Sequence, residues 1–235
     1  MRSSRWQALG NAYELVEPGQ PALDADGARA VAAGADGALE VASVDEDAVE
    51  LLIWNSDGSR AELSGNGTRI VATWFFERTG KATVRIRVGS REVVAHRLPD
   101  GRIEQGLGRY EVGGREVLDD VEVTPVAVGN PHAVVLGDPA TIEELGPALE
   151  RHPRFPNRTN VQVARVDAPG VVTARVWERG VGETRSSGTS AVAVAAATHG
   201  HGDVLVRFPG GDLSVRLENG SAWVTGPPAE RVPSS

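Results

Sequence analysis

The sequence contains no cysteine, and this absence excludes several kinds of chemistry at once. Disulfide bonds, thiolate metal sites and thiol nucleophiles all require that residue. The five histidines show no metal-ligand spacing, so we expect no bound metal. The chain therefore has neither disulfide cross-links nor a catalytic thiol.

A basic surface and a long apolar run are also missing. Acidic residues outnumber basic ones by 32 to 24, and the formal net charge of −8 argues against nucleic acid or an anionic membrane as the partner. No apolar run approaches the roughly 20 residues of a membrane span. Residues 1–9 lack the apolar core of a secretory signal. We therefore expect a cytoplasmic protein that binds neither nucleic acid nor membrane.

Short strand-like stretches are numerous, and helix-like ones are few. Strand candidates are rich in Val and Ile or alternate with polar residues, and turn residues bound them. They include residues 51–54, 83–88, 92–98, 121–128, 132–136, 161–166, 171–177, 204–208, 213–217 and 222–225. Helix candidates span residues 22–33, 68–79, 142–151 and 191–198. The sequence predicts an α+β protein with more strand than helix.

Two of the helix candidates are apolar on every side. Residues 68–79 include Trp74, Phe75 and Phe76, and residues 191–198 read AVAVAAAT. A helix that is apolar all round is usually buried. Both are expected to lie in the core.

The chain also repeats a set of landmarks. Gly10-Asn11 has a counterpart in Gly129-Asn130, and a serine follows nine residues after Asn55 and again nine residues after Glu178. These serines open the two apolar helices, as Ser64-Gly65-Asn66-Gly67 and Ser187-Gly188-Thr189-Ser190. Gly-Asn pairs are common in turns, but three landmarks in one order indicate two similar halves that meet face to face. We expect residues 1–112 and 113–235 to form them, because Gly113-Gly114 and Asp119-Asp120 are typical of surface chain.

The two Ser-Gly helix starts are candidate anion sites. A helix N-terminus exposes unpaired N–H groups and a partial positive charge, and glycine lets a ligand approach the backbone. Ser64 and Ser187 could each be an ordinary N-cap. As a matched pair, they suggest that two sets of N–H donors share one carboxylate ligand.

Motifs throughout the chain resemble those of the diaminopimelate epimerase family. They occur in the family's order and cover residues 9–227, and the stretch 178–184 and Gly65-Asn66-Gly67 are specific. The matching segments are residues 10–11, 54–59, 64–69, 129–132, 159–161, 178–184, 187–189 and 209–211.

This resemblance implies a fold and an activity. The family fold has two similar halves, each a mostly antiparallel strand barrel around a central helix, which agrees with the repeat. The activity is a cofactor-independent epimerisation at the α-carbon of an amino acid, in which one group removes the proton and another returns it on the opposite face. The expected reaction converts LL- to meso-diaminopimelate, a precursor of lysine and peptidoglycan. The resemblance also implies a possible homodimer.

The same resemblance assigns the substrate-binding residues. Arg179 would pair with the distal carboxylate of the substrate, and Glu178 would meet its ammonium group. Backbone N–H groups at the two helix starts would hold the reacting carboxylate, and four asparagines would line the site with amides. The backbone N–H groups belong to Gly65, Asn66, Gly188 and Thr189. The four asparagines are Asn11, Asn55, Asn130 and Asn160.

The chain departs from the family where the proton is transferred, because Ser64 and Ser187 stand where the family has cysteines. A free thiol has a pKa of about 8.5, whereas an unactivated hydroxyl is closer to the ~15.7 of bulk water. The difference of about seven units corresponds to roughly 10 kcal/mol, and a helix N-terminus returns only about 0.3–2 kcal/mol to an anion. A neighbouring base would have to assist each serine. His132 and Glu178 are the candidates, in either assignment to the two serines.

Three functions are therefore open. The chain is a working epimerase with assisted serines, or a related lyase or isomerase of the same fold, or a binding protein that keeps the pocket without turnover.

Overall fold

The computed structural model describes residues 1–233, which form two compact units. Unit 1 comprises Met1–Gly106 together with the segment from Gly226 onward, and unit 2 comprises Leu107–Thr225. The C-terminal segment belongs to unit 1 because β18 (Glu230–Arg231) pairs with β1 (Ser3–Ala8). The division into functional halves at residues 1–112 and 113–235 stays a prediction.

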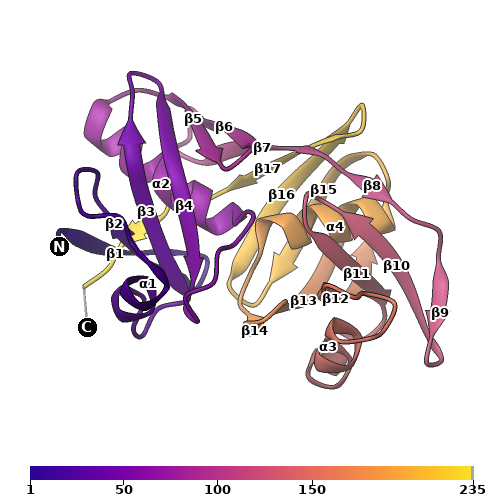
Figure 1. The fold of residues 1–235 in the computed structure, drawn as a ribbon. Helices are drawn as coiled ribbons and strands as arrows, with labels where there is room; N and C mark the ends of the chain where they lie inside the picture. The colour runs from indigo at the N-terminus through magenta and orange to yellow at the C-terminus, as the bar shows by residue number, and fades with distance from the viewer. Residues whose placement is uncertain (234–235) are drawn as a thin grey trace. The chain divides into compact units, whose positions relative to one another are not determined.

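A curled sheet forms the frame of unit 1 (Figure 1). After β1 it contains β2 (Asn11–Val16), β3 (Gly37–Val44), β4 (Ala48–Asn55), β5 (Thr83–Val88), β6 (Arg91–Arg97) and the first residues of β7 (Ile103–Arg109), a strand that continues into unit 2. The β2–β3 and β4–β5 pairs are parallel. The β1–β2, β3–β4, β5–β6 and β6–β7 pairs are antiparallel.

Unit 2 repeats this order of strands. Its main strands are β10 (Val121–Ala127), β11 (Pro131–Leu136), β12 (Asn160–Ala168), β13 (Val171–Glu178), β15 (Gly202–Phe208), β16 (Gly211–Glu218) and β17 (Ser221–Gly226). Short strands β8 (Glu111–Val112) and β9 (Glu116–Leu118) pair with β10, and β14 (Gly182–Thr184) pairs with β13.

The correspondence between the units extends to strand direction and to irregularities. The β11–β12 and β13–β15 pairs are parallel, as are their counterparts in unit 1. The register shifts once in β3, between Val41 and Ser43, and once in β12, between Val166 and Ala168. The predicted α+β fold of two pseudo-symmetric halves is therefore confirmed.

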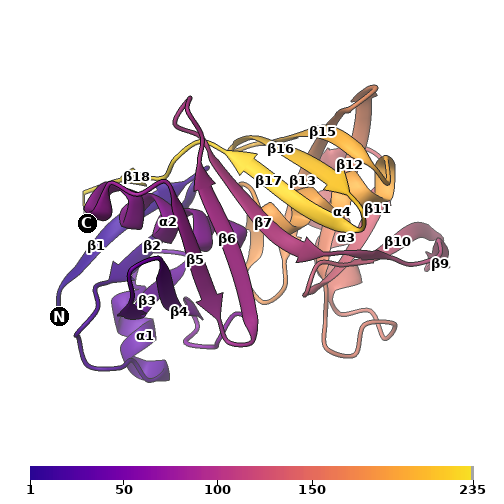
Figure 2. The same cartoon turned by 90° about the horizontal axis from the view of Figure 1, so that it is seen from above.

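Each unit encloses one helix. All residues of α2 (Gly65–Thr79) up to Phe76 are buried, and Figure 2 shows this helix against β5 and β6. In unit 2, α4 (Gly188–Thr198) is buried up to Ala196 and contacts β10, β11, β12, β13, β15 and β16. The burial expected from the apolar sequences is confirmed. Both helices begin three residues before the predicted start, because Ser64 and Ser187 cap them.

Two further helices cover strands from outside the enclosed cores. Helix α1 (Ala25–Val31) packs on β3 and β4, and α3 (Ile142–Glu150), preceded by the 3-10 turn Pro139–Thr141, packs on β12 and β13. Alternate residues of β12 face the two helices: Val161 and Val163 lie in the cluster with α3, whereas Gln162 bonds to α4. Within residues 1–233, no helix has the length and apolar character needed to cross a membrane.

Candidate active site

Ser64 caps the enclosed helix of unit 1. Its backbone is extended, and its Oγ accepts a hydrogen bond from Gly67 N at 3.0 Å. A Cβ at position 67 would lie 2.9 Å from Leu39 Cδ2 and 3.2 Å from Ser64 Oγ, so a larger residue there would crowd the capping serine. The first two N–H groups of α2 belong to the buried residues Gly65 and Asn66. The partial positive charge of the helix therefore reaches the site through their backbone.

A tyrosine hydroxyl lies next to Ser64. Tyr13 Oη is 3.1 Å from Ser64 Oγ, and either oxygen can be the donor. Sequence analysis did not identify Tyr13, although the repeat contained a signal for it. Tyr13 follows Asn11 by two residues on β2, as His132 on β11 follows Asn130, which precedes that strand. Residues two apart on a strand share a face, so Tyr13 lies beside Asn11, and His132 Nε2 lies 2.8 Å from Asn130 Oδ1.

Two of the predicted asparagines meet in unit 1, and the third has a different role. Asn66 Nδ2 donates to Asn11 Oδ1 at 3.0 Å, and both residues are only 3% exposed. Asn55 ends β4, where its Nδ2 donates to Ser59 Oγ at 2.9 Å within the following turn. The structure thus brings Asn11, Ser64, Gly65 and Asn66 together at the start of α2.

Ser187 caps the enclosed helix of unit 2. Its Oγ lies 3.4 Å from Ser190 N and 3.5 Å from Thr189 Oγ1, so both contacts are longer than those of Ser64. Gly188 and Thr189 follow it as buried residues and supply the first N–H groups of α4. Among the residues of unit 2, all of which the structure describes, no carboxylate or imidazole bonds to Ser187 Oγ.

His132 belongs to a buried network beside α4. Its Nε2 is 2.8 Å from Asn130 Oδ1, and its Nδ1 is 3.0 Å from Gln162 Nε2. Asn130 Nδ2 in turn donates to Thr189 Oγ1 at 3.4 Å. This pattern assigns the proton of a neutral imidazole to Nε2, so that Nδ1 accepts from the glutamine.

The electrostatic surroundings of His132 keep it neutral. Burial, together with the charge of Arg179, lowers the pKa of His132 to about 3. Both ring nitrogens are already bonded to amides, so the contacts favour a positioning role for this residue. Its role as the base for a serine stays a prediction.

Asn160 ties β11 to the turn that carries Arg179. Its Nδ2 donates to Pro131 O at 2.9 Å, and its Oδ1 accepts from Arg179 N at 2.9 Å. The guanidinium of Arg179 donates from Nη1 to Asn157 O at 3.4 Å. The side chain is half-buried, so a planar anion can reach it.

The carboxylate of Glu150, which sequence analysis missed, also holds the turn that contains Arg179. Glu150, 3% exposed, accepts from Gly180 N at 2.8 Å and from Trp177 Nε1 at 2.9 Å. Arg158 Nη1 lies 3.3 Å from the same side chain. Glu178, half-buried on this turn, accepts a short hydrogen bond from Thr184 Oγ1. Unit 2 thus gathers Asn130, His132, Asn160, Glu178, Arg179, Ser187, Gly188 and Thr189 around β11–β13 and the start of α4.

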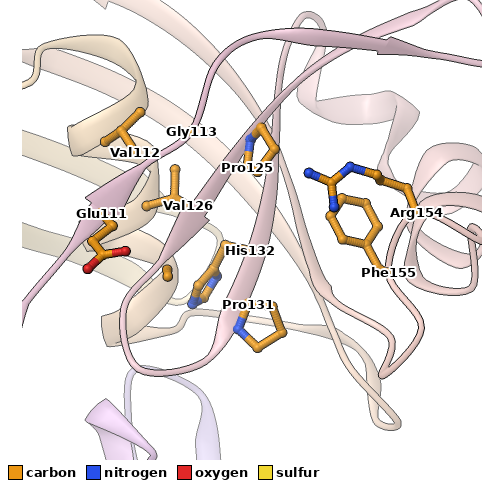
Figure 3. A pocket seen from close by; sticks show the side chains of 10 residues that line it. Glu111, Val112, Gly113, Pro125, Val126, Pro131, His132, Arg154 and Phe155 are labelled. Atoms are coloured by element: carbon orange, nitrogen blue, oxygen red, sulfur yellow. The ribbon is translucent and has the colours of Figure 1, made fainter.

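A pocket of about 330 Å³ adjoins the His132 network, but neither Ser64 nor Ser187 lines it (Figure 3). Its apolar lining comes mainly from Pro125, Val126, Pro131 and Phe155. The Arg154 guanidinium lies 5.6 Å from the centre of the Phe155 ring. His132 is the one predicted site residue in its lining. Across residues 1–233, no group of three or more His, Asp or Glu side chains could hold a metal ion.

Solved structures of two epimerases share this fold. A predicted epimerase from Pseudomonas aeruginosa matches with a TM-score of 0.75 at 16% identity, over 99% of this chain and 97% of that one. A hydroxyproline epimerase from Agrobacterium vitis with bound trans-4-hydroxy-L-proline matches with a TM-score of 0.72 at 16% identity, over 98% and 90% of the two chains. At these identities the likeness shows the fold.

Sequence comparison identifies the family. The model described as diaminopimelate epimerase matches residues 124–229. The diaminopimelate epimerase of Desulforudis audaxviator is 36% identical, over 98% of this chain and 97% of its own length. That of Thermobifida fusca is 41% identical, over 74% of this chain and 67% of its own. The chain belongs to the diaminopimelate epimerase family.

Proposed function

We propose that this chain is an amino-acid epimerase that inverts the α-carbon of diaminopimelate or a close analogue without a cofactor. The observation that carries the proposal is the serine-capped, enclosed helix in each unit of a chain that belongs to this family. With diaminopimelate as substrate, the reaction would serve lysine biosynthesis. A cytoplasmic location and a homodimer remain predictions from the sequence.

The helix starts supply the electrostatic part of the reaction. Removing an α-proton places negative charge on the carbon and on the adjoining carboxylate. In our proposal, backbone N–H groups of Gly65 and Asn66 in unit 1, and of Gly188 and Thr189 in unit 2, bind that carboxylate. Preorganised donors of this kind are among the largest contributors to catalysis, because they need not reorganise as charge develops.

The other end of the substrate is recognised by the turn after β13. Arg179 would bind the distal carboxylate in a forked geometry, and Glu178 would bind an ammonium group of the substrate. Asn160 holds this turn through its bond to Arg179 N, and Glu150 holds it through Gly180 N. The asparagines Asn11, Asn55 and Asn130 complete the set of polar groups that we assign to the substrate.

Proton transfer is assigned to Ser64 and Ser187, one serine for each face of the α-carbon. Tyr13 is the titratable group in contact with Ser64 Oγ, and it can take part in a hydroxyl relay. His132 and Glu178 stay the candidate bases from the sequence. Because Ser187 Oγ has neither an imidazole nor a carboxylate bonded to it within the described residues of unit 2, a binding protein that keeps the pocket without turnover is the second candidate.

Deuterium exchange separates these functions. The chain is incubated with LL- or meso-diaminopimelate in D2O, and the α-proton signal and the isomer ratio are followed by NMR. Loss of the α-proton with stereoinversion is the expected result for an epimerase. Binding, detected by calorimetry, without any exchange would establish the binding protein instead. If the chain neither binds diaminopimelate nor exchanges its α-proton, this substrate is excluded, and a lyase or isomerase of the same fold is favoured.

The Arg179→Ala variant tests recognition of the distal carboxylate. We expect its affinity for diaminopimelate to fall by on the order of 100-fold, because a charge-assisted hydrogen bond contributes about 1.5–3 kcal/mol. Affinity for a monocarboxylic amino acid of similar length should change little. Calorimetric titration of both ligands measures the difference, and equal losses would contradict the assignment of Arg179.

A further inference from the structure

A buried guanidinium lies in the helix that Ser64 caps. Arg69 is 0% exposed. Its Nε and Nη1 have no hydrogen-bond partner among residues 1–233, and no carboxylate there pairs with it. Burial lowers the pKa of Arg69 to about 10, which still leaves the side chain protonated at neutral pH. An unpaired buried charge destabilises a fold, so its presence near a site calls for a functional explanation.

Within residues 1–233, the one hydrogen bond of the Arg69 side chain leads to the site. Its Nη2 donates to Asn66 Oδ1 at 2.7 Å, and Asn66 Nδ2 donates to Asn11 Oδ1 at 3.0 Å. A guanidinium has donors and no acceptor, so it fixes which end of each amide faces which neighbour. The orientation of both amides therefore follows from the guanidinium: Asn66 Oδ1 faces Arg69, and Asn11 Oδ1 faces Asn66.

The equivalent positions of unit 2 have no such charge. Val192 follows Ser187 by five residues, as Arg69 follows Ser64, and Val192 is also 0% exposed. There the amide of Asn130 is oriented by the neutral imidazole of His132. The two units therefore support their serines differently, one with a buried cation and the other with uncharged groups.

We propose that Arg69 is a positioning residue that fixes the amide orientation of Asn66 and Asn11 and adds positive potential at the start of α2. An anion there, either the substrate carboxylate or a deprotonated group at position 64, is stabilised by this charge. Only the identity of the substrate anion rests on the proposed function. At an effective dielectric constant of about 20, a unit charge about 7–10 Å away lowers the pKa of an acid by about 1–2 units.

The absence of cysteine allows a direct test. In the Ser64→Cys variant the introduced thiol is the only one in the chain, so its pKa can be read from the pH dependence of alkylation and of thiolate absorbance. Adding Arg69→Met is expected to raise this pKa by about 1–2 units. Adding Arg69→Lys should restore most of the difference, because it keeps the charge. The matched control is Ser187→Cys with and without Val192→Met, a substitution at the equivalent helix position that removes no charge, so the shift should be less than half as large.

The proposal is overturned if Arg69→Met leaves the thiol pKa of the Ser64→Cys variant unchanged. It is also overturned if the pKa shifts measured at positions 64 and 187 are equal. Tyr13 is the titratable neighbour of position 64, so the series is repeated with Tyr13→Phe to separate its contribution. If circular dichroism shows that Arg69→Met is unfolded, Arg69→Gln takes its place as the neutral variant. The readout requires no turnover, so it stands independently of the deuterium-exchange result.

Discussion

Replacing both Ser64 and Ser187 by cysteine is expected to accelerate α-proton exchange from diaminopimelate by on the order of 10²–10⁴-fold, the range typical of a well-matched general acid–base pair. The reason is the pKa difference of about seven units between a thiol and an unactivated hydroxyl. A thiol at either helix start is partly ionised near neutral pH, whereas a serine hydroxyl is not. NMR in D2O measures the exchange rate of both proteins.

The two single variants are the controls for this prediction. Each places a thiol on one side of the reaction, so each should exchange or invert more slowly than the double variant. A double variant no faster than the unmodified chain would contradict the assignment of positions 64 and 187 to proton transfer. Circular dichroism and ligand affinity would show whether fold and pocket were retained.

Truncating Phe75 to alanine is expected to lower the free energy of unfolding by about 3–5 kcal/mol. Phe75 is 0% exposed within the enclosed helix of unit 1, and its ring meets that of Phe76 edge to face, with centroids 6.2 Å apart. The lost contacts and the cavity left behind both destabilise the fold. Urea unfolding followed by circular dichroism measures the change.

An exposed apolar residue provides the comparison. Val117 is 68% exposed, so Val117→Ala should change the unfolding free energy by less than about 0.5 kcal/mol. Equal effects at positions 75 and 117 would contradict the enclosed position of α2. A loss at position 75 below about 1 kcal/mol would do the same.

Sequence patterns predicted the enclosed helices and most later strands well, and the first strands poorly. Residues 83–88 were predicted as a strand with the bounds that β5 has. Strands β1, β2 and β3 were not among those predicted, because buried charged side chains interrupt their alternation. Arg5 on β1 pairs with Glu14 on β2 at 2.8 Å, and Glu40 on β3 accepts from Trp54 Nε1. Partners distant in sequence satisfy these charges, and no local pattern shows the pairing.

The sequence predicted which residues could belong to the candidate site. It did not predict the hydrogen-bond partners of these residues. Gly-Asn and Ser-Gly landmarks indicate where amides and helix starts occur, since turn chemistry and capping are local. The bonds of Asn160 to Arg179 N and of Glu150 to Gly180 N join segments 19 and 30 residues apart. Arg69 was missed for the same reason, because its importance comes from the side chain it meets after folding. Tyr13 could have been identified from its place in the repeat, where it corresponds to His132.

The discontinuity of unit 1 has a consequence for how the chain is made. Unit 2 is one continuous stretch of chain. Unit 1 is formed by two stretches, and the second of them, which begins at Gly226, is synthesised after all of unit 2. In that segment Ala229 is buried and its N–H donates to Thr73 Oγ1 on α2, and β18 adds to β1. As the ribosome synthesises the chain from its first residue, the earlier half must wait for the final segment. Unit 2 has all of its residues before unit 1 can complete its fold.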